Sequence, residues 1–193
     1  MLSIDLEKKP DPRVARTNKL LEQAFMEILK EKGFQTITVQ DITERAGVNR
    51  ATFYAHFQDK YALLDHSIRQ GFLQEIEKRM LNACHFSMDN LQNLIVAVCE
   101  FTSNTNAHCK PPLTQFESLV ETQVKGVMYE LLLNWLKQME VDVPPETAAT
   151  AASWAIYGLA AQWGHSQTPK PVDEFAREVL PLVAANLNLT HPA

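Results

Sequence analysis

The sequence predicts an all-α protein of about nine helices. Apolar residues recur every three or four positions along most of the 193-residue chain, which is the spacing of one helix face. No segment shows sustained alternation with enrichment in β-branched residues, as strands do. Prolines interrupt the periodic segments at residues 111–112, 144–145 and 169–171, where they break helical hydrogen bonding. These three observations together favour a chain of helices joined by short turns.

The N-terminal part predicts a short helix over 39–46, with Val39, Ile42 and Ala46 on one face. Thr38 and Asp41 resemble a capping box for the short helix, with aspartate in place of the usual glutamate. Gly47 supplies the permissive backbone that a tight turn after this helix needs. The pattern therefore indicates a helix that ends in a turn at a defined residue.

A second short helix is expected directly after this turn. Asn49 is a good N-cap for it, and Phe53 and Phe57 lie four residues apart, so they can anchor one side. Asp59 caps the next helix. Residues 36–60 therefore predict a helix–turn–helix followed at once by a third helix, a geometry that can present a helix N-terminus to the DNA major groove.

The rest of the chain is expected to be helical. A stripe of apolar residues predicts one long helix that begins at Asp59. The expected helices after the turn cover residues 59–81, 89–106, 113–140, 146–164 and 173–189.

Residues 16–64 resemble the DNA-binding domain of TetR-family transcriptional repressors. The resemblance rests on four features: an amphipathic helix over 16–32 that ends in Gly33-Phe34, the run Thr38–Val48, the run Phe53–Phe57 with the sequence FYAHF, and Lys60. Thr43 stands where the family commonly has alanine, and Tyr61 stands where an acidic residue is frequent. The resemblance implies a DNA-binding domain over 1–60 and a helical ligand-binding and dimerisation domain over 61–193.

The predicted recognition helix offers side chains for bases and for phosphates. Arg50 lies in its first turn, and an arginine can donate two hydrogen bonds to guanine O6 and N7. Ala51 and Thr52 are candidates for a base edge or a thymine methyl group, and the remaining polar groups are assigned to the phosphate backbone. The complete predicted DNA-binding set is Thr38, Asn49, Arg50, Ala51, Thr52, Tyr54, His56 and Lys60.

The last two expected helices carry small and apolar residues that allow close helix packing. These residues can fill the core of one chain, or they can meet a second copy in a four-helix bundle. The family resemblance implies the second arrangement, a homodimer that reads a palindromic operator in double-stranded DNA. The predicted interface is Ala148, Ala152, Ala155, Gly158, Trp163, Phe175, Val179, Leu182 and Val183.

Aromatic and soft side chains in the C-terminal part can line an apolar cavity or fill a solid core. The resemblance implies a cavity for a small apolar or aromatic effector that releases a repressor from DNA. The candidate residues are Phe101, His108, Phe116, Met128, Trp135, Trp154 and Tyr157. Two alternatives stay open: a DNA-binding protein without an effector, and a metal- or thiol-sensing regulator that uses Cys84-His85, Cys99 and His108-Cys109.

Composition limits the other classes. The net charge of −5 divides into +1 over residues 1–60 and −6 over residues 61–193, so charge permits DNA binding at the N-terminal end alone. No phosphate-binding glycine loop, nucleophile elbow or His-Glu-x-x-His motif is present, and we predict no enzyme, no cofactor and no metal. The longest apolar run, Leu94–Cys99, is too short to span a membrane. We expect a soluble, cytoplasmic bacterial protein.

Overall fold

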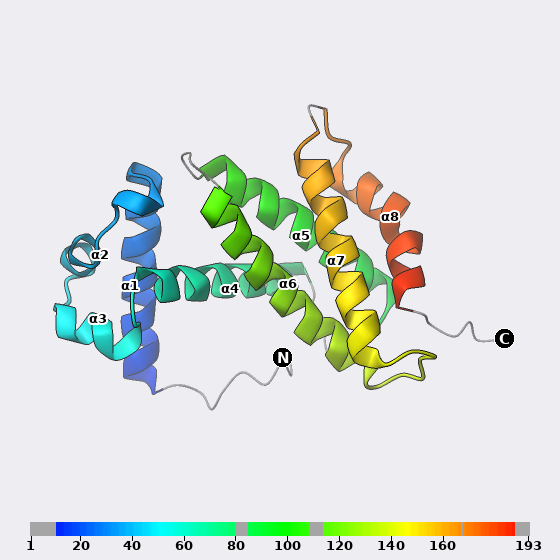
Figure 1. Ribbon diagram of the computed structural model, residues 1–193, viewed down its shortest axis with the longest axis horizontal. Helices are drawn as coiled ribbons and strands as arrows, with labels where there is room; N and C mark the ends of the chain where they lie inside the picture. Colours follow the sequence, from blue (N-terminus) through cyan, green and yellow to red (C-terminus); the bar gives the residue numbers. More distant parts are fainter. Residues whose placement is uncertain (1–10, 80–84, 109–113, 167, 188–193) are drawn as a thin grey trace.

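The computed structural model describes residues 11–79, 85–108, 114–166 and 168–187. These residues form eight α-helices, one short 3-10 helix and no strand (Figure 1), so the all-α prediction is confirmed with one helix fewer than expected. The helices are α1 (Pro12–Glu31), α2 (Val39–Ala46), α3 (Arg50–His56), α4 (Lys60–Arg79), α5 (Met88–His108), α6 (Thr114–Leu136), α7 (Pro145–Gly164) and α8 (Val172–Asn186), with η1 (Phe34–Thr36) between α1 and α2.

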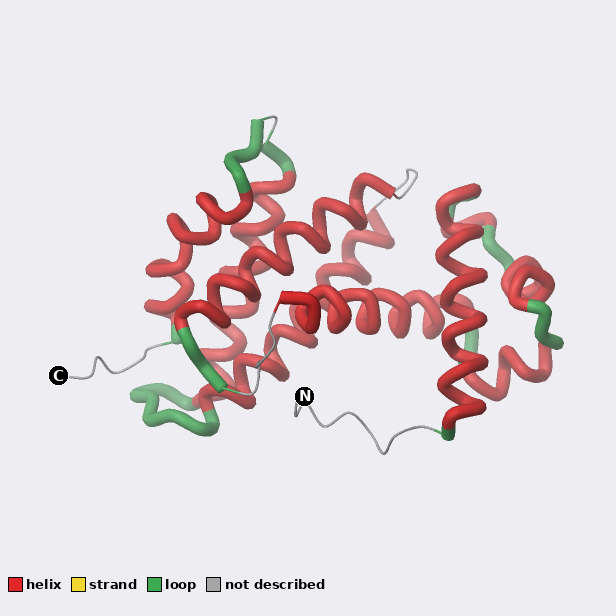
Figure 2. The backbone as a smooth tube through the Cα atoms, turned by 180° about the vertical axis from the view of Figure 1, so that it is seen from behind, coloured by secondary structure: helices red, strands yellow, loops and turns green. Residues whose placement is uncertain are grey.

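The helices divide into a head, formed by α1 to α3, and a body, formed by α5 to α8. Figures 1 and 2 show α4 running crosswise from α1 into the body, so that it joins the two parts. In the body α5 contacts α4, α6, α7 and α8. The head is therefore held on the body mainly through α4.

Local sequence signals explain where the head helices begin and end. Asp11 caps α1 by accepting a hydrogen bond from the Arg13 backbone N–H at 2.8 Å, and Pro12 occupies the first helical position, where proline is tolerated. The helix therefore starts four residues before the expected Arg16. Helix α2 has the predicted bounds. Asp59 caps α4 as predicted, because its Oδ1 accepts from the backbone N–H of Tyr61 and of Ala62 at 2.8 Å.

One hydrophobic core runs through the head and the body. In the head, buried residues from all three helices and from η1 meet, and in the body the run Leu94–Cys99 is buried on all sides. A helix that is apolar all round is expected where other helices enclose it, which explains the longest apolar run of the sequence. The main head residues of this core are Leu21, Phe25, Ile28, Phe34, Ile37, Ile42, Phe53 and Phe57.

Polar side chains of α4 bind it to three other helices. His66 Nε2 lies 2.6 Å from the Glu22 carboxylate of α1, and Arg69 lies 2.6 Å from Glu130 of α6. Arg79 forms an ion pair with Glu100 of α5. Over the described ranges, none of the helices combines the length and the hydropathy that crossing a membrane requires.

Candidate nucleic-acid interface

The N-terminus of α2 is held by a complete capping box. The Asp41 backbone N–H donates to Thr38 Oγ1 at 3.1 Å, and the Thr38 backbone N–H donates to Asp41 Oδ2 at 2.7 Å. Lys32 Nζ lies 2.8 Å from the same carboxylate. Hydrogen bonds from Lys32 and then from Thr38 hold the pKa of Asp41 well below its usual range. The start of α2 is therefore fixed relative to the end of α1.

A left-handed glycine ends α2 and sets the direction of α3. Gly47 has φ 67°, a conformation that a Cβ atom disfavours. The Val48 backbone N–H donates to the Thr43 carbonyl oxygen at 3.0 Å and closes the turn. Asn49 then caps α3, because its Oδ1 accepts from the Thr52 backbone N–H at 2.7 Å. These contacts produce the helix–turn–helix that the sequence predicts.

Helix α3 divides into a buried side and an open side. Phe53 and Phe57 are buried, as predicted. Arg50, Ala51, Tyr54 and Ala55 are exposed; we call these four residues the reading face, and their spacing places them on one side of the helix. Tyr54 is 51% exposed, and the Arg50 guanidinium has no hydrogen bond or ion pair with any described residue. The reading face is free to meet another molecule.

Lys60 takes part in the fold of the head, which revises the phosphate contact predicted for it. Its ammonium donates to the carbonyl oxygens of Phe34, Gln35 and Ile37 at 3.1, 3.0 and 2.8 Å, and it lies 4.8 Å from the centroid of the Phe34 ring. Burial lowers the pKa of Lys60. An ammonium has three N–H donors, so these carbonyl oxygens use all of them.

Three further members of the predicted set, His56, Thr52 and Asn49, also have intramolecular partners. His56 Nδ1 lies 2.6 Å from Asn18 Oδ1 and joins α3 to α1. The Thr52 hydroxyl donates to Asn49 Oδ1 at 3.0 Å, and both side chains therefore stabilise the start of α3. Thr38, which caps α2, remains exposed.

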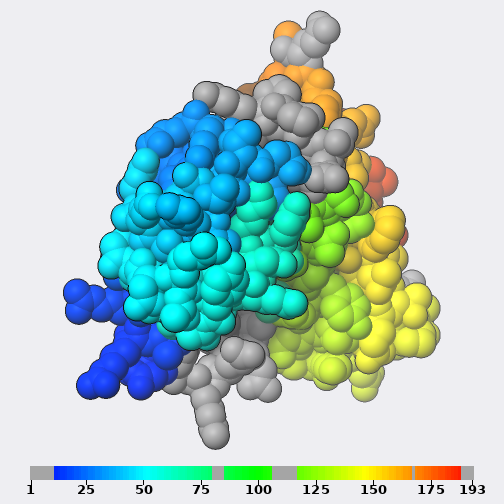
Figure 3. All heavy atoms as spheres, turned by 60° about the vertical axis from the view of Figure 1, so that its left-hand side comes forward, coloured from blue at the N-terminus to red at the C-terminus, as the bar shows by residue number. Residues whose placement is uncertain are grey.

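The sequence interpretation missed three cations at the start of α1. Arg13, Arg16 and Lys19 are exposed, and in the described ranges their charged groups have no ion-pair partner. The contact between His56 and Asn18 places this part of α1 beside the end of α3. Figure 3, which turns the head forward, shows the dark-blue start of α1 projecting beside the cyan surface that includes α3. The three basic residues recur every third position over residues 13–19, and this pattern was the sequence signal that could have identified them.

The predicted effector residues do not come together. Met128 and Trp135 are buried in the core, whereas Trp154 is 62% exposed with Lys125 Nζ 3.5 Å from its ring centroid. Tyr157 is half-buried between α6 and α7, where burial and then Glu121 raise its pKa to about 12. The side chains of His108 and Phe116 lie outside the described residues.

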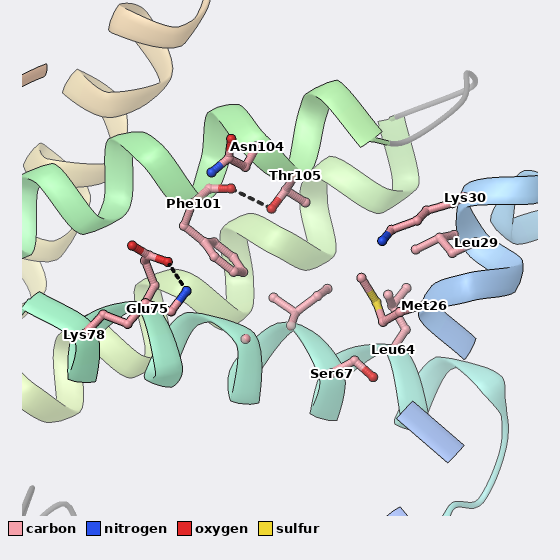
Figure 4. A pocket seen from close by; sticks show the side chains of 12 residues that line it. Met26, Leu29, Lys30, Leu64, Ser67, Glu75, Lys78, Phe101, Asn104 and Thr105 are labelled. Atoms are coloured by element: carbon pink, nitrogen blue, oxygen red, sulfur yellow. Dashed lines mark hydrogen bonds and ion pairs between the residues drawn. The ribbon is translucent and has the colours of Figure 1, made fainter. Parts of the chain in front are cut away.

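Phe101 is the one member of that set whose described side chain lines the cavity between α1, α4 and α5. This cavity has a volume of about 330 Å³ (Figure 4).

Part of the predicted dimer interface is buried inside the single chain. Ala148, Ala152, Val179 and Val183 are at most 5% exposed, because they face the core on which α7 and α8 pack. These four residues expose almost no surface to a second copy, and the dimer itself stays a prediction. Ala155, Trp163 and Phe175 are half-buried, and Gly158 and Leu182 are exposed.

No group of three or more metal-binding side chains occurs among the residues that the structure describes. Cys99 is a free, buried thiol, and burial raises its pKa to about 12, which disfavours the reactive thiolate. Cys84 and Cys109 lie outside the described residues. Cys99 therefore does not support the metal- and thiol-sensing alternative.

Comparison with known proteins agrees with this geometry. Residues 20–66, which contain the end of α1 and all of α2 and α3, match the family profile described as "Bacterial regulatory proteins, tetR family". The chain is 33% identical to an uncharacterized HTH-type transcriptional regulator, YxbF of Bacillus subtilis, over 182 residues. That alignment covers 90% of this chain and 46% of YxbF, so the chain spans about half the length of this relative.

Two further similarities extend beyond the head. The chain is 28% identical to the class G tetracycline repressor protein of Vibrio anguillarum over 114 residues, which are 55% of this chain and 53% of that protein. A solved TetR-family regulator from Streptomyces coelicolor has the same fold, with a TM-score of 0.63 and 17% identity over 93% of this chain and 99% of that one.

Proposed function

By its N-terminal domain the chain belongs to the TetR family of bacterial regulatory proteins, and on that premise we propose that it is a sequence-specific transcriptional repressor whose α3 reads DNA as half of a homodimer. The observation that carries the proposal is the reading face. It combines an arginine, a tyrosine and two alanines on an exposed helix that is capped at its N-terminus and fixed by Phe53 and Phe57. A rigid helix with short side chains can enter the major groove closely.

The reading face has distinct chemical roles in this proposal. Arg50 reaches a guanine edge with two N–H donors. Ala51 and Ala55 contact base edges or thymine methyl groups, and the Tyr54 hydroxyl donates to a phosphate oxygen. Asn49 and Thr52 contribute through the cap that fixes the start of α3.

In this proposal, groups of α1 and α2, on both sides of α3, bind the DNA phosphates. The N-terminus of α2 offers the backbone N–H groups of Val39 and Gln40 to a phosphate, because those of Thr38 and Asp41 are used in the capping box. Arg13, Arg16 and Lys19 of α1 supply the positive charge that Lys32, Arg45 and Lys60 cannot, because those three are engaged within the head. The proposed phosphate-binding groups are therefore the side chains of Arg13, Arg16, Lys19 and Tyr54 and the first backbone N–H groups of α2, whose start Thr38 fixes.

The proposed dimer uses the outer sides of α7 and α8. The apolar residues that remain exposed there include Ala151, Trp154, Gly158, Leu182 and Ala185, and Trp154 and Leu182 are each 62% exposed. A twofold axis through such a surface makes both copies use the same residues. Two recognition helices related by that axis would read an inverted repeat, with centres about 34–36 Å apart.

In this proposal a small molecule releases the protein from DNA. The cavity between the head and the body is the site that supports it. A ligand that binds better to one orientation of the head shifts the population toward that orientation. About 3 kcal/mol of coupling weakens DNA binding roughly a hundredfold.

Selection of bound duplexes from random DNA with the purified chain tests the proposed function. The expected result is enrichment of an inverted repeat whose half-sites lie about one helical turn apart. Failure to enrich any sequence, with nonspecific binding alone, would remove the claim of specific recognition. Enrichment of one half-site without a repeat would remove the dimer.

A further inference from the structure

The cavity between α1, α4 and α5 is mostly apolar. Met26 and Leu29 come from α1, Leu64 and Ile68 come from α4, and Phe101 comes from α5. Figure 4 shows the Phe101 ring pointing from α5 toward α4, with Met26 and Leu64 at the end nearer α1. An apolar ligand body placed here would contact the head and the body of the protein at once.

A glycine keeps part of this space open. Gly71 of α4 lines the cavity, and a Cβ atom at this position would lie 3.4 Å from Phe101 Cε2, with nothing nearer. A methyl group is therefore accommodated, whereas a longer side chain would extend into the cavity. This gives a substitution that fills the site and a matched one that does not.

The charge at the edge of the cavity is positive and localised. Three charged side chains line it: Lys30, Glu75 and Lys78. Glu75 is already neutralised by Lys78 at 3.1 Å and by Arg79 at 3.3 Å. Lys30 has no ion-pair partner among the described residues, and Figure 4 shows its nitrogen directed over the cavity from α1. The arrangement complements a single negative charge at the α1 end.

The volume limits the size of the ligand. A cavity of about 330 Å³ holds roughly ten non-hydrogen atoms, at the ~30 Å³ that a water molecule occupies in the liquid. It lies at the small end of the range of small-molecule sites. A compact ligand fits, and a large polycyclic one does not.

We propose that this cavity binds a small amphipathic carboxylate, with its apolar body against Phe101, Leu64 and Ile68 and its carboxylate paired with Lys30. The inference rests on the proposed function in one respect, since it assigns the effector of the repressor to this class. The occupant touches α1 of the head and α5 of the body, so its affinity depends on their relative orientation. By linkage, DNA that favours a different orientation is then bound less tightly.

The test is calorimetric titration of the full chain with three probes of equal chain length: octanoate, 1-octanol and octylammonium. Octanoate is expected to bind saturably at one site per chain and at least about tenfold more tightly than octylammonium, since a charge-assisted hydrogen bond contributes enough for that ratio. Lys30→Met should weaken octanoate binding about tenfold and leave octanol binding unchanged. Lys137→Met, which replaces an exposed lysine after α6 that does not line the cavity, should bind octanoate as the unsubstituted chain does.

The cavity itself is tested at Gly71. Gly71→Leu should abolish octanoate binding, whereas Gly71→Ala should retain it. If octanoate does not bind saturably, or binds equally well to Lys30→Met and Gly71→Leu, the proposal is overturned. Lys30 is exposed, so Lys30→Met keeps the test decisive even if Gly71→Leu fails to fold.

DNA binding separates this inference from the proposed function. A chain that binds its selected duplex without ligand but does not bind octanoate contradicts the cavity assignment alone. A chain that selects no duplex contradicts the proposed function, whatever octanoate does. Saturating octanoate should lower the affinity for the selected duplex, and an unchanged affinity would overturn the assignment of this carboxylate as effector.

Discussion

Lys60 shows how one side chain can hold the head together. Its ammonium joins three carbonyl oxygens of the connection between α1 and α2, those of Phe34, Gln35 and Ile37, to the first turn of α4. An ammonium that donates to several carbonyl oxygens of a connection stabilises that connection. The residue thereby fixes where α2 begins relative to α4.

Replacement of this ammonium should destabilise the protein. We expect Lys60→Met to lower the free energy of unfolding by about 2 kcal/mol, because three carbonyl oxygens lose a charged donor. Lys78→Met, which removes an exposed cation with one ion pair, should change it by less than about 1 kcal/mol. Urea unfolding of the three proteins measures the difference.

A phosphate role for Lys60 would give a different result. The variant would then unfold like the parent chain, and the dependence of DNA affinity on salt would lose about one unit of slope. Either observation would favour the phosphate contact that the sequence predicts for Lys60.

At the residue scale, side-chain type predicted the buried aromatic residues better than the polar contacts. Phe53 and Phe57 have one favourable environment, the core. Lys60 and His56 have several favourable environments. An ammonium binds a carbonyl oxygen as well as a phosphate, and an imidazole binds a side-chain amide as well as a phosphate. Which partner is present depends on chain segments far away in sequence, such as Asn18 beside His56.

At the element scale, the turn between α2 and α3 depends on the left-handed conformation of Gly47. We expect Gly47→Ala to lower the free energy of unfolding by roughly 1–2 kcal/mol, the cost of a Cβ atom in this conformation. Gly33→Ala is the matched control, because Gly33 has φ −62° and open space around a new Cβ atom, and it should be neutral or slightly stabilising. Thermal unfolding compares the two, and equal effects would contradict the role of the turn.

The capping box of α2 gives a second prediction for an element. Thr38→Ala should cost about 1 kcal/mol, and Thr38→Ser should retain most of the stability because it keeps the hydroxyl. Urea unfolding at neutral pH measures both. If Thr38→Ser is as unstable as Thr38→Ala, the hydroxyl does not act as the cap.

The same box makes stability depend on pH. The pKa of Asp41 is depressed in the folded state, so its contribution is present above the unfolded pKa of about 4 and is lost as the pH falls through the folded value. Asp41→Asn should therefore be less stable than the parent chain at pH 7, and the difference should shrink below about pH 4. A difference that is constant between pH 7 and pH 3 would exclude this carboxylate as the cause.

Helix positions followed from sequence signals that act locally. Capping residues and prolines predicted α2, α3 and the breaks in the body, because their effects need no distant partner. The interface residues of α7 and α8 were harder, because periodicity identifies an apolar side without identifying what covers it. Ala148 and Ala152 proved to face the core of the same chain.

At the scale of the whole molecule, the proposed assembly is a homodimer in which the head of each copy contacts one half-site of the DNA. Leu182→Glu places a charge on the exposed side of α8 and should convert the dimer to a monomer, as measured by sedimentation. Leu20→Glu is the control, because it changes an exposed leucine of α1 and should leave the dimer intact. A Leu182→Glu protein that remains dimeric would exclude this side of α8 as the interface.

Charge distribution over the whole molecule favours contact with DNA at the head alone. The part of the chain after residue 60 carries most of the negative charge. In the head, the described cations Arg13, Arg16, Lys19 and Arg50 are exposed and have no ion-pair partner. The sequence predicted this division of net charge, but it could not show which cations would be free and which, like Lys32 and Arg45, would form ion pairs. The latter pair with Asp41 and Glu31 through folding.

The central claim is that the exposed side of α3 reads base sequence, and competition binding tests it most directly. The measurement is the ratio of affinities for the selected duplex and a scrambled duplex at one salt concentration, for the parent chain, Arg50→Ala and the control Arg177→Ala on α8. The account predicts that Arg50→Ala lowers this ratio by about 5- to 150-fold, equivalent to about 1–3 kcal/mol, while Arg177→Ala leaves it unchanged. An unchanged ratio in Arg50→Ala would contradict the claim.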